Sequence, residues 1–187
     1  MKKAAVFIDK DGTLVHDVAF NVDPSQIRLR EGVGDALRRL GEHNYELVLV
    51  SNQAGVALGR FDEDALQFVW TRLQSLLSEE GARLDAFYYC PHHPEGQVAP
   101  YAIACDCRKP AAGMLTRAAQ ERGIDLEASW MVGDILDDVE AGHRAGCRSI
   151  LLDVGSETEW IASSLRTPDH IARDLGDVTA HILGTRQ

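Results

Sequence analysis

Two carboxylates stand one residue apart where an apolar stretch near the start of the chain ends. The segment FIDKDGT places Asp9 and Asp11 on either side of Lys10, and Gly12 and Thr13 follow directly. Carboxylate oxygens are hard ligands that suit Mg²⁺, and an ionised carboxylate can attack phosphorus as a nucleophile. The pair therefore indicates metal-assisted phosphoryl chemistry, with a simple turn at Asp11-Gly12 as the alternative.

Three further polar clusters follow later apolar runs. Ser51 opens the segment SNQ, Lys109 lies in RKP, and Asp134 lies in GDILDD. A hydroxyl and a lysine can hold phosphate oxygens where negative charge accumulates in a phosphoryl-transfer transition state. With these groups beside it, Asp9 could stay ionised as the nucleophile, and Asp11 could serve as general acid and base. These assignments require all four clusters to share one edge of a sheet.

The elements that must position these clusters are indicated by the apolar pattern. Short apolar runs without alternation predict strands buried on both faces, and the segments between them have helical periodicity. We therefore expect an α/β fold with a doubly wound parallel sheet of Rossmann-like type, whose ligands lie outside the carboxyl ends of the strands. The expected strands are 4–8, 46–50, 86–89, 130–132 and 149–152, the expected helices are 32–41, 62–81, 113–123 and 136–146, and residues 170–183 are expected to add a short strand and a closing helix.

Length and charge restrict the class of protein. A chain of 187 residues suffices for one core, so we expect residues 1–187 to form a single domain without a large cap. The formal charge of -10, from 29 acidic and 19 basic residues, argues against a nucleic-acid partner. No apolar run approaches the roughly 18–20 residues of a membrane span, so we expect no membrane partner, a cytoplasmic location and reduced cysteines.

One segment, residues 90–107, interrupts the regular pattern and holds most of the cysteines. Irregular segments of this length usually carry a function or a metal. Three thiolates and an imidazole form the closed four-ligand set of a structural zinc site, which Mg²⁺ would not share. A Cys105–Cys107 disulfide and plain buried thiols are the alternatives. The expected zinc ligands are Cys90, His92, Cys105 and Cys107, with His93 as the alternative to His92.

Taken in order, DKDGT, SNQ, RKP and GDILDD resemble the four motifs of the haloacid dehalogenase (HAD) superfamily over nearly the whole chain. The resemblance implies that Asp9 becomes an aspartyl-phosphate and that Asp11 is the acid and base. It also implies that Ser51 and Lys109 hold the phosphate. The implied Mg²⁺ ligands are Asp9, the backbone carbonyl of Asp11, and Asp134.

Within that superfamily, the strings YYCPHHPEG and CDCRKP resemble a zinc-bearing branch that contains heptose bisphosphate and histidinol-phosphate phosphatases. The long connection between the two halves of the cysteine loop favours the heptose branch. The resemblance then implies hydrolysis of D-glycero-D-manno-heptose 1,7-bisphosphate at the 7-phosphate. Histidinol phosphate or another sugar phosphate is the alternative substrate. The implied substrate contacts are Asp17, Phe20, Asn52, Gln53, Arg60 and Arg108.

Other readings of the sequence stay open. Transfer of the phosphoryl group to an alcohol would use the same residues as hydrolysis. A zinc-stabilised binding module with structural acids belongs to a different class, which the negative charge disfavours. Asp137 and Asp138 match the trailing acids of the fourth motif, and the resemblance implies that one of them supports Lys109 or a metal-bound water, but the sequence does not assign a role to either one. By analogy with other cores that lack a cap we expect a monomer.

Overall fold

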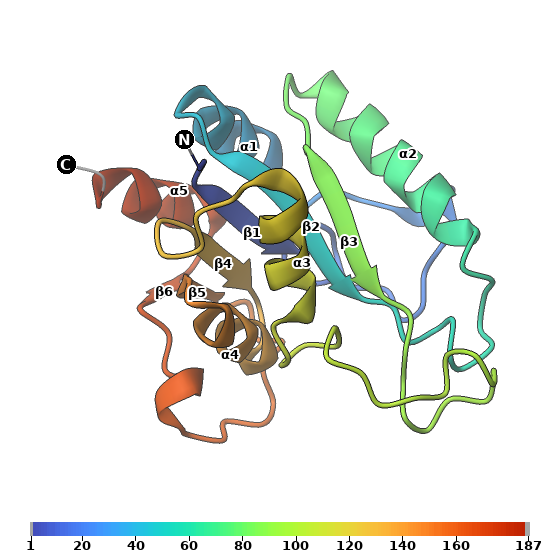
Figure 1. Ribbon diagram of the computed structural model, residues 1–187. Helices are drawn as coiled ribbons and strands as arrows, with labels where there is room; N and C mark the ends of the chain where they lie inside the picture. Colours follow the sequence, from blue (N-terminus) through green and yellow to red (C-terminus); the bar gives the residue numbers. More distant parts are fainter. Residues whose placement is uncertain (1, 186–187) are drawn as a thin grey trace.

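The computed structural model describes residues 2–185 and contains a six-stranded sheet with helices on both faces (Figure 1). Residues 1 and 186–187, which the predicted domain includes, lie outside the described residues. The strand order is β3-β2-β1-β4-β5-β6, and every neighbouring pair is parallel. The expected doubly wound α/β fold is confirmed. The strands are β1 (Ala5–Asp9), β2 (Glu46–Asn52), β3 (Ala86–Cys90), β4 (Trp130–Gly133), β5 (Arg148–Leu152) and β6 (His170–Ala172).

The helices fall close to the expected segments. The tail contributes the expected short strand and closing helix. Within residues 2–185 no helix has the length and apolar character needed to cross a membrane. The α-helices are α1 (Val33–Glu42), α2 (Ala65–Glu79), α3 (Gly113–Arg122), α4 (Leu136–Ala145) and α5 (Leu175–Gly184), and short 3-10 turns are η1 (Pro24–Gln26) and η2 (Ser164–Arg166).

Four strands, β1 to β4, end later than their apolar runs predict, and in β1 and β2 the added residues are polar. Asp9 still pairs with Val50 in the β1–β2 ladder, and Ser51 and Asn52 continue the β2–β3 ladder. Ladder pairing uses backbone groups, so a polar side chain does not end a strand while the neighbouring strand continues. These polar residues therefore lie at the C-terminal ends of paired strands and not in the loops that follow.

Alternating side chains of β1 divide the core into two layers. Val6 and Ile8 pack with residues of α1, α2 and α5 on one face. Ala5 and Phe7 pack with residues of α3 and α4 on the other face. A central strand buried on both faces cannot tolerate polar residues before its end, which explains why the first carboxylate appears only at Asp9.

The side on which successive strands are added changes at β1, at the centre of the sheet. From β1 the chain adds β2 and β3 on one side, and it then returns to add β4 on the other side of β1. Ile8 pairs with Val132, so the ends of β1 and β4 lie side by side. In open parallel sheets the crevice at such a switch point is where ligands bind. Asp9 and Asp134 flank this crevice.

The segment after β5, residues 153–169, crosses α4 and is held there by ion pairs. Arg166 of η2 contacts Asp137 at 2.9 Å and Glu140 at 3.0 Å. Asp137, whose role the sequence left open, therefore has a structural contact: its carboxylate binds Arg166 and holds this segment against α4.

Two imidazoles stack at the other end of the sheet. The rings of His170 and His181 lie 3.9 Å apart with an interplanar angle of 8°, and Trp130 meets His181 edge-on. Partial burial and the neighbouring charge of His170 lower the pKa of His181. The unfolded chain then binds a proton at this site more readily than the folded protein. The contribution of neutral His181 to the free energy of unfolding is therefore complete above the ordinary histidine pKa of about 6.5. It is lost as the pH falls below that value.

We expect His181→Gln to reduce the pH dependence of stability. Between pH 7.5 and pH 5.0 the wild-type Tm should fall by more than the Tm of this variant, because the variant has no imidazole to protonate at position 181. Thermal unfolding followed by circular dichroism at both pH values measures the difference. His16→Gln, at an exposed histidine, is the matched control and should behave like the wild type. An equal fall in wild type and His181→Gln would contradict this account.

Candidate active site

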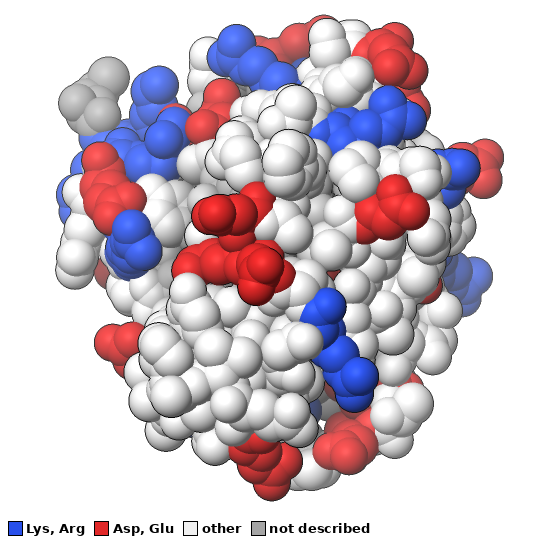
Figure 2. Space-filling view, turned by 90° about the vertical axis from the view of Figure 1, so that its right-hand side faces the viewer, with Lys and Arg blue, Asp and Glu red and all other residues white. Residues whose placement is uncertain are grey.

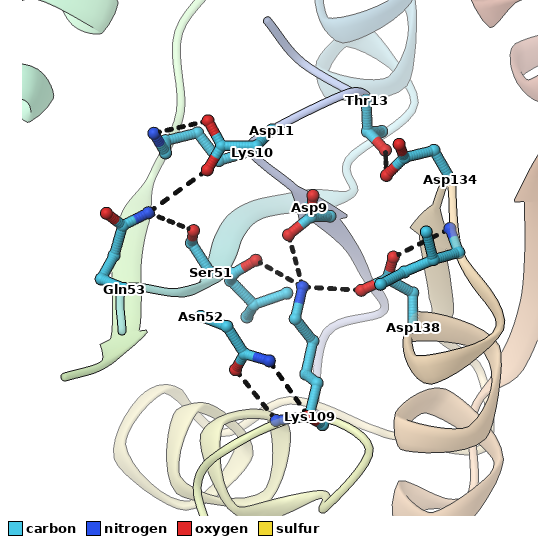
Figure 3. A network of polar contacts seen from close by, with 12 residues as sticks. Asp9, Lys10, Asp11, Thr13, Ser51, Asn52, Gln53, Lys109, Asp134 and Asp138 are labelled. Carbon is cyan, nitrogen blue, oxygen red and sulfur yellow. Dashed lines mark hydrogen bonds and ion pairs between the residues drawn. The ribbon is translucent and has the colours of Figure 1, made fainter. Parts of the chain in front are cut away.

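Lys109 lies at the centre of the polar groups on the carboxyl edge of the sheet (Figure 3). Its Nζ donates to the Asp9 carboxylate and to the carbonyl of Val50, and it forms an ion pair with Asp138 at 2.6 Å. The Lys109 residue is only 3% exposed. Burial alone would lower the pKa of Lys109, but the charges of Asp138 and Asp9 outweigh burial and raise it. The ammonium is therefore permanently charged and aimed into the site.

Two carboxylates, those of Asp9 and Asp138, contact this ammonium, and the carboxylate of Asp134 lies beside them. Ligand oxygens of Asp9, Asp134 and Asp138 all lie within 4.8 Å of one another. Burial, reinforced by the charge of Asp9, raises the pKa of Asp134 to about 6. Burial also raises the pKa of Asp9, although Lys109 opposes the shift. This buried excess of negative charge and hard oxygen donors is the environment that a divalent cation such as Mg²⁺ stabilises.

Two glycines allow these carboxylates to approach so closely. Gly12 has a φ of +81°, and a Cβ there would lie 1.9 Å from Oδ2 of Asp134. A Cβ on Gly133 would lie 2.2 Å from the Cβ of Asp138. Thr13 adds a hydroxyl that donates to Oδ1 of Asp134 at 3.1 Å. The small and hydroxyl residues of the two motifs thus make space for the acids and orient them.

A second chain of contacts joins Ser51, Gln53 and Asp11. Gln53 donates through Nε2 to Ser51 Oγ at 2.6 Å and, at 3.4 Å, to Asp11 Oδ2. Lys10 forms an ion pair with the other Asp11 oxygen at 2.7 Å. Figure 3 shows the Asp11 carboxylate turned toward Lys10 and Gln53 and away from Asp9. Because Gln53 supplies a hydrogen to the Ser51 oxygen, the hydroxyl hydrogen of Ser51 is available to an incoming acceptor.

The side chain of Asn52 contacts the backbone of Lys109. Its Nδ2 donates to the Lys109 carbonyl at 3.0 Å, and the Lys109 N–H donates to Asn52 Oδ1 at 3.0 Å (Figure 3). The sequence assigned Asn52 and Gln53 to the substrate. In the structure both carboxamides already hold neighbouring groups of the site.

The cysteine loop also converges on one point. Cys107 Sγ lies 3.1 Å from Cys90 Sγ, 3.2 Å from Cys105 Sγ and 3.3 Å from His92 Nδ1. All these cysteines are free, so the structure contains no Cys105–Cys107 disulfide. Burial raises the pKa of the thiols of Cys90 and Cys107, and a bound cation would be needed to stabilise their thiolates. Three sulfurs and one imidazole nitrogen in contact fit a tetrahedral zinc ion.

The remaining predicted substrate residues lie outside the central cluster. The Arg60 guanidinium lies 5.8 Å from the centre of the Phe20 ring, and Phe20 is 50% exposed with a φ of 55°. Arg108 is half-buried, and its Nη1 has no hydrogen-bond partner within residues 2–185. Asp17 is exposed, and in the described part of the chain no hydrogen bond or ion pair joins it to another predicted site residue. Phe20 and Arg60 thus meet, whereas Asp17 stands apart.

Two further residues contribute to the site: Asp138, which the sequence could not distinguish from Asp137, and Ser156, which it did not single out. Asp138 is buried in the first turn of α4, where it accepts a hydrogen bond from the Ile135 N–H at 3.4 Å. The paired acids of GDILDD were a visible signal, but they did not reveal which acid faces Lys109. Ser156, after β5, donates a hydrogen bond that partly offsets the raised pKa of Asp134. No local pattern distinguishes Ser156 from other loop serines.

Comparison with known proteins defines the class first. The HAD-hydrolase-like family model matches residues 106–178, which contain Lys109, Asp134 and Asp138. The parallel sheet carries the acids and the buried lysine at its switch point. The protein is therefore a HAD-type phosphatase, a hydrolase of phosphate monoesters.

Relatives then define the family. A D-glycero-beta-D-manno-heptose-1,7-bisphosphate 7-phosphatase of Haemophilus ducreyi is 40% identical over 183 residues, which is 97% of this chain and 100% of the relative. The protein of the same name from Photorhabdus laumondii is 42% identical over 188 residues, 98% of this chain and 97% of the relative. The solved D,D-heptose 1,7-bisphosphate phosphatase of B. bronchiseptica, complexed with magnesium and phosphate, has a TM-score of 0.79 and 29% identity, and covers 97% of this chain and 99% of its own. The chain belongs to the family of D-glycero-beta-D-manno-heptose-1,7-bisphosphate 7-phosphatases, which confirms the resemblance found in its motifs.

Proposed function

We propose that this protein removes the 7-phosphate of D-glycero-β-D-manno-heptose 1,7-bisphosphate by way of an aspartyl-phosphate. One observation carries the proposal. Lys109 contacts Asp9 and Asp138 at the switch point of the sheet, and Asp134 completes the cluster. Relatives that are 40% and 42% identical over 97% and 98% of this chain bear the name of this activity.

In the first half of the reaction the Asp9 carboxylate attacks phosphorus. An Asp9 oxygen forms the new bond to phosphorus as the bond from phosphorus to the sugar oxygen breaks. Asp11 donates a proton to that departing oxygen, so the sugar leaves as an alcohol. The Lys109 ammonium and the Ser51 hydroxyl hold the phosphoryl oxygens, whose negative charge rises in the transition state.

In the second half the aspartyl-phosphate is hydrolysed. Asp11, now ionised, takes a proton from a water molecule, and the water oxygen attacks phosphorus. The bond between phosphorus and the Asp9 oxygen breaks, which restores Asp9 and releases inorganic phosphate. Asp11 has to reach the reacting oxygen in both halves. Its carboxylate is turned toward Gln53 and Lys10, so a side-chain rotation would bring it to the reacting oxygen.

Two metal sites with different donors complete the proposal. Asp9, the Asp11 carbonyl and Asp134 would hold Mg²⁺, and Asp138 would support Lys109. A Mg²⁺ ion bound there would neutralise charge on the phosphate and on the crowded carboxylates. Three cysteines and one histidine would hold a structural zinc ion, since this donor set leaves no open position for chemistry. The zinc ligands would be Cys90, His92, Cys105 and Cys107.

The predicted substrate contacts outside the acid cluster would recognise the remainder of the substrate. Arg108 has a buried guanidinium nitrogen with no hydrogen-bond partner among the described residues, which suits an arriving phosphate or hydroxyl oxygen. Phe20 presents an exposed ring, with Arg60 held over it, and Asp17 lies on the same loop as Phe20. The arginine side chains could bind an anionic sugar bisphosphate, and the exposed ring of Phe20 could pack against its sugar.

The remaining features follow from the same picture. Residues 1–187 would act as a single catalytic domain and as a monomer, and reduced zinc-binding thiols suit the cytoplasm. Figure 2 shows acidic and basic side chains interspersed on the side of the molecule that faces right in Figure 1. Phosphate backbones of nucleic acids favour a continuous basic surface, which this face does not provide. The expected partner is therefore a small anionic sugar phosphate.

A substrate panel tests the assignment. We expect kcat/KM for the β anomer of heptose 1,7-bisphosphate to exceed that for heptose 7-phosphate by about 10–100-fold, because a second phosphate adds charged hydrogen bonds. Release of inorganic phosphate is measured for both anomers, for histidinol phosphate and for simple sugar monophosphates. A flat profile, or histidinol phosphate as the best substrate, would overturn the proposed specificity. Phosphate appearing on an added alcohol would show transfer instead of hydrolysis.

A further inference from the structure

Both backbone polar groups of Lys109 are satisfied by one side chain, that of Asn52. The Lys109 N–H and carbonyl each form a 3.0 Å hydrogen bond with the carboxamide, and neither has a backbone partner within residues 2–185. We propose that Asn52 is the positioning residue that fixes where the Lys109 ammonium stands. This inference rests on the proposed role of Lys109 in holding the phosphate.

Lys109 needs such an anchor because regular structure does not hold it. Residues 91–112 form neither helix nor strand, and Lys109 lies near the end of this segment. Asn52, in contrast, occupies the last position of β2 and is paired with Cys90 in the sheet. The carboxamide therefore transmits the rigidity of the sheet to a loop residue whose ammonium must meet Asp9 and Asp138.

The hydrogen-bond inventory of Asn52 argues against a main role in substrate binding. A carboxamide has one oxygen acceptor and two N–H hydrogens. The oxygen accepts one bond from Lys109 and one hydrogen is donated to it, so half of the carboxamide's capacity, one hydrogen and one oxygen lone pair, remains for a substrate. Loss of this side chain would leave the backbone N–H and carbonyl of the buried Lys109 without these partners, and the lysine would be free to shift.

The chain contains the same clamp at a second place. Gln74 of α2 donates to the Leu84 carbonyl at 2.8 Å and accepts from the Leu84 N–H at 3.1 Å. Gln74 and Asn52 are both half-buried. Gln74→Ala therefore removes an equivalent pair of hydrogen bonds that does not touch the site. This variant therefore distinguishes the general effect of losing two such hydrogen bonds from the specific effect of misplacing Lys109.

The test compares Asn52→Ala with Gln74→Ala, using heptose 1,7-bisphosphate and p-nitrophenyl phosphate. We expect Asn52→Ala to lower kcat by about 10–100-fold with KM within about twofold, because displaced catalytic groups cost about that much. Gln74→Ala should change kcat by less than about twofold. In a Lys109→Met background, Asn52→Ala should have less than about a twofold further effect, because no ammonium is left to place.

Each other outcome overturns the inference. A raised KM with unchanged kcat would make Asn52 a substrate contact, and a full effect in the Lys109→Met background would show that it acts independently of Lys109. Equal loss of kcat in Gln74→Ala would indicate general loosening. If Asn52→Ala is poorly folded by its melting curve, Asn52→Asp, which keeps the shape and one acceptor, takes its place with the same expectation. Failure of the wild type on heptose bisphosphate would refute the proposed substrate alone, since p-nitrophenyl phosphate still reports on Asn52.

Discussion

Asp9→Asn is expected to lower kcat by about 10⁴–10⁶-fold, the range seen when an enzyme loses its nucleophile. The carboxamide has nearly the shape of the carboxylate, but it carries no anionic oxygen that can attack phosphorus. Lys109 keeps its ion pair with Asp138, so the buried ammonium retains a partner. The variant also has one charge fewer in the crowded acid cluster. We therefore expect the fold and the melting temperature to be nearly unchanged.

Kinetics and trapping together measure this effect. Release of phosphate gives kcat, and mass spectrometry of the acid-quenched wild type during turnover should detect one added phosphoryl group, which is absent in Asp9→Asn. Asp35→Asn, at an exposed aspartate of α1, is the matched control and should retain wild-type turnover. Turnover by Asp9→Asn within tenfold of the wild type would refute the nucleophile assignment.

Cys107→Ser should have the second largest effect, because Cys107 lies at the centre of the sulfur cluster. Its Sγ contacts both other thiols and His92. A structural zinc ion contributes its binding energy directly to folding. Loss of at least about 3 kcal/mol would lower the Tm of a chain of this size by about 10 °C. We also expect kcat to fall, because Lys109 follows Cys107 by two residues.

Metal content and melting temperature measure this prediction. The wild type should contain one equivalent of zinc, and Cys107→Ser should contain far less. Cys147→Ser is the matched control, because Cys147 is a buried free thiol outside the cluster and its replacement should leave the zinc content intact. A wild type purified without zinc, or a Cys107→Ser variant that still carries a full equivalent, would contradict the assignment of a structural zinc site.

Local patterns in the sequence were enough to predict most of the fold. Unbroken apolar runs marked the parallel strands, and helical periodicity marked the segments between them. The strand limits were less accurate, because Asp9, Ser51 and Asn52 continue ladders that side-chain polarity does not reveal. The cysteine cluster was also visible, since its spacing alone restricts which residues can share an ion.

The partner of each polar group was decided by the tertiary structure. Asp137 and Asp138 are adjacent in the sequence, yet one binds Arg166 of the crossing segment and the other binds Lys109. Nothing local separates them, because the difference depends on which side of α4 faces the site and on the path of residues 153–169. The same holds for Asn52, whose contact with Lys109 joins positions far apart along the chain.

The sequence by itself thus determined the sheet, the order of its chemical groups and the edge where they gather. Apolar periodicity and strand ends are properties of neighbouring residues, and every parallel strand delivers its carboxyl end to the same edge. Only the tertiary structure decided which acid pairs with the lysine and which amide holds its backbone. Those choices depend on register, on helix rotation and on loop paths, which are set by packing across the whole chain.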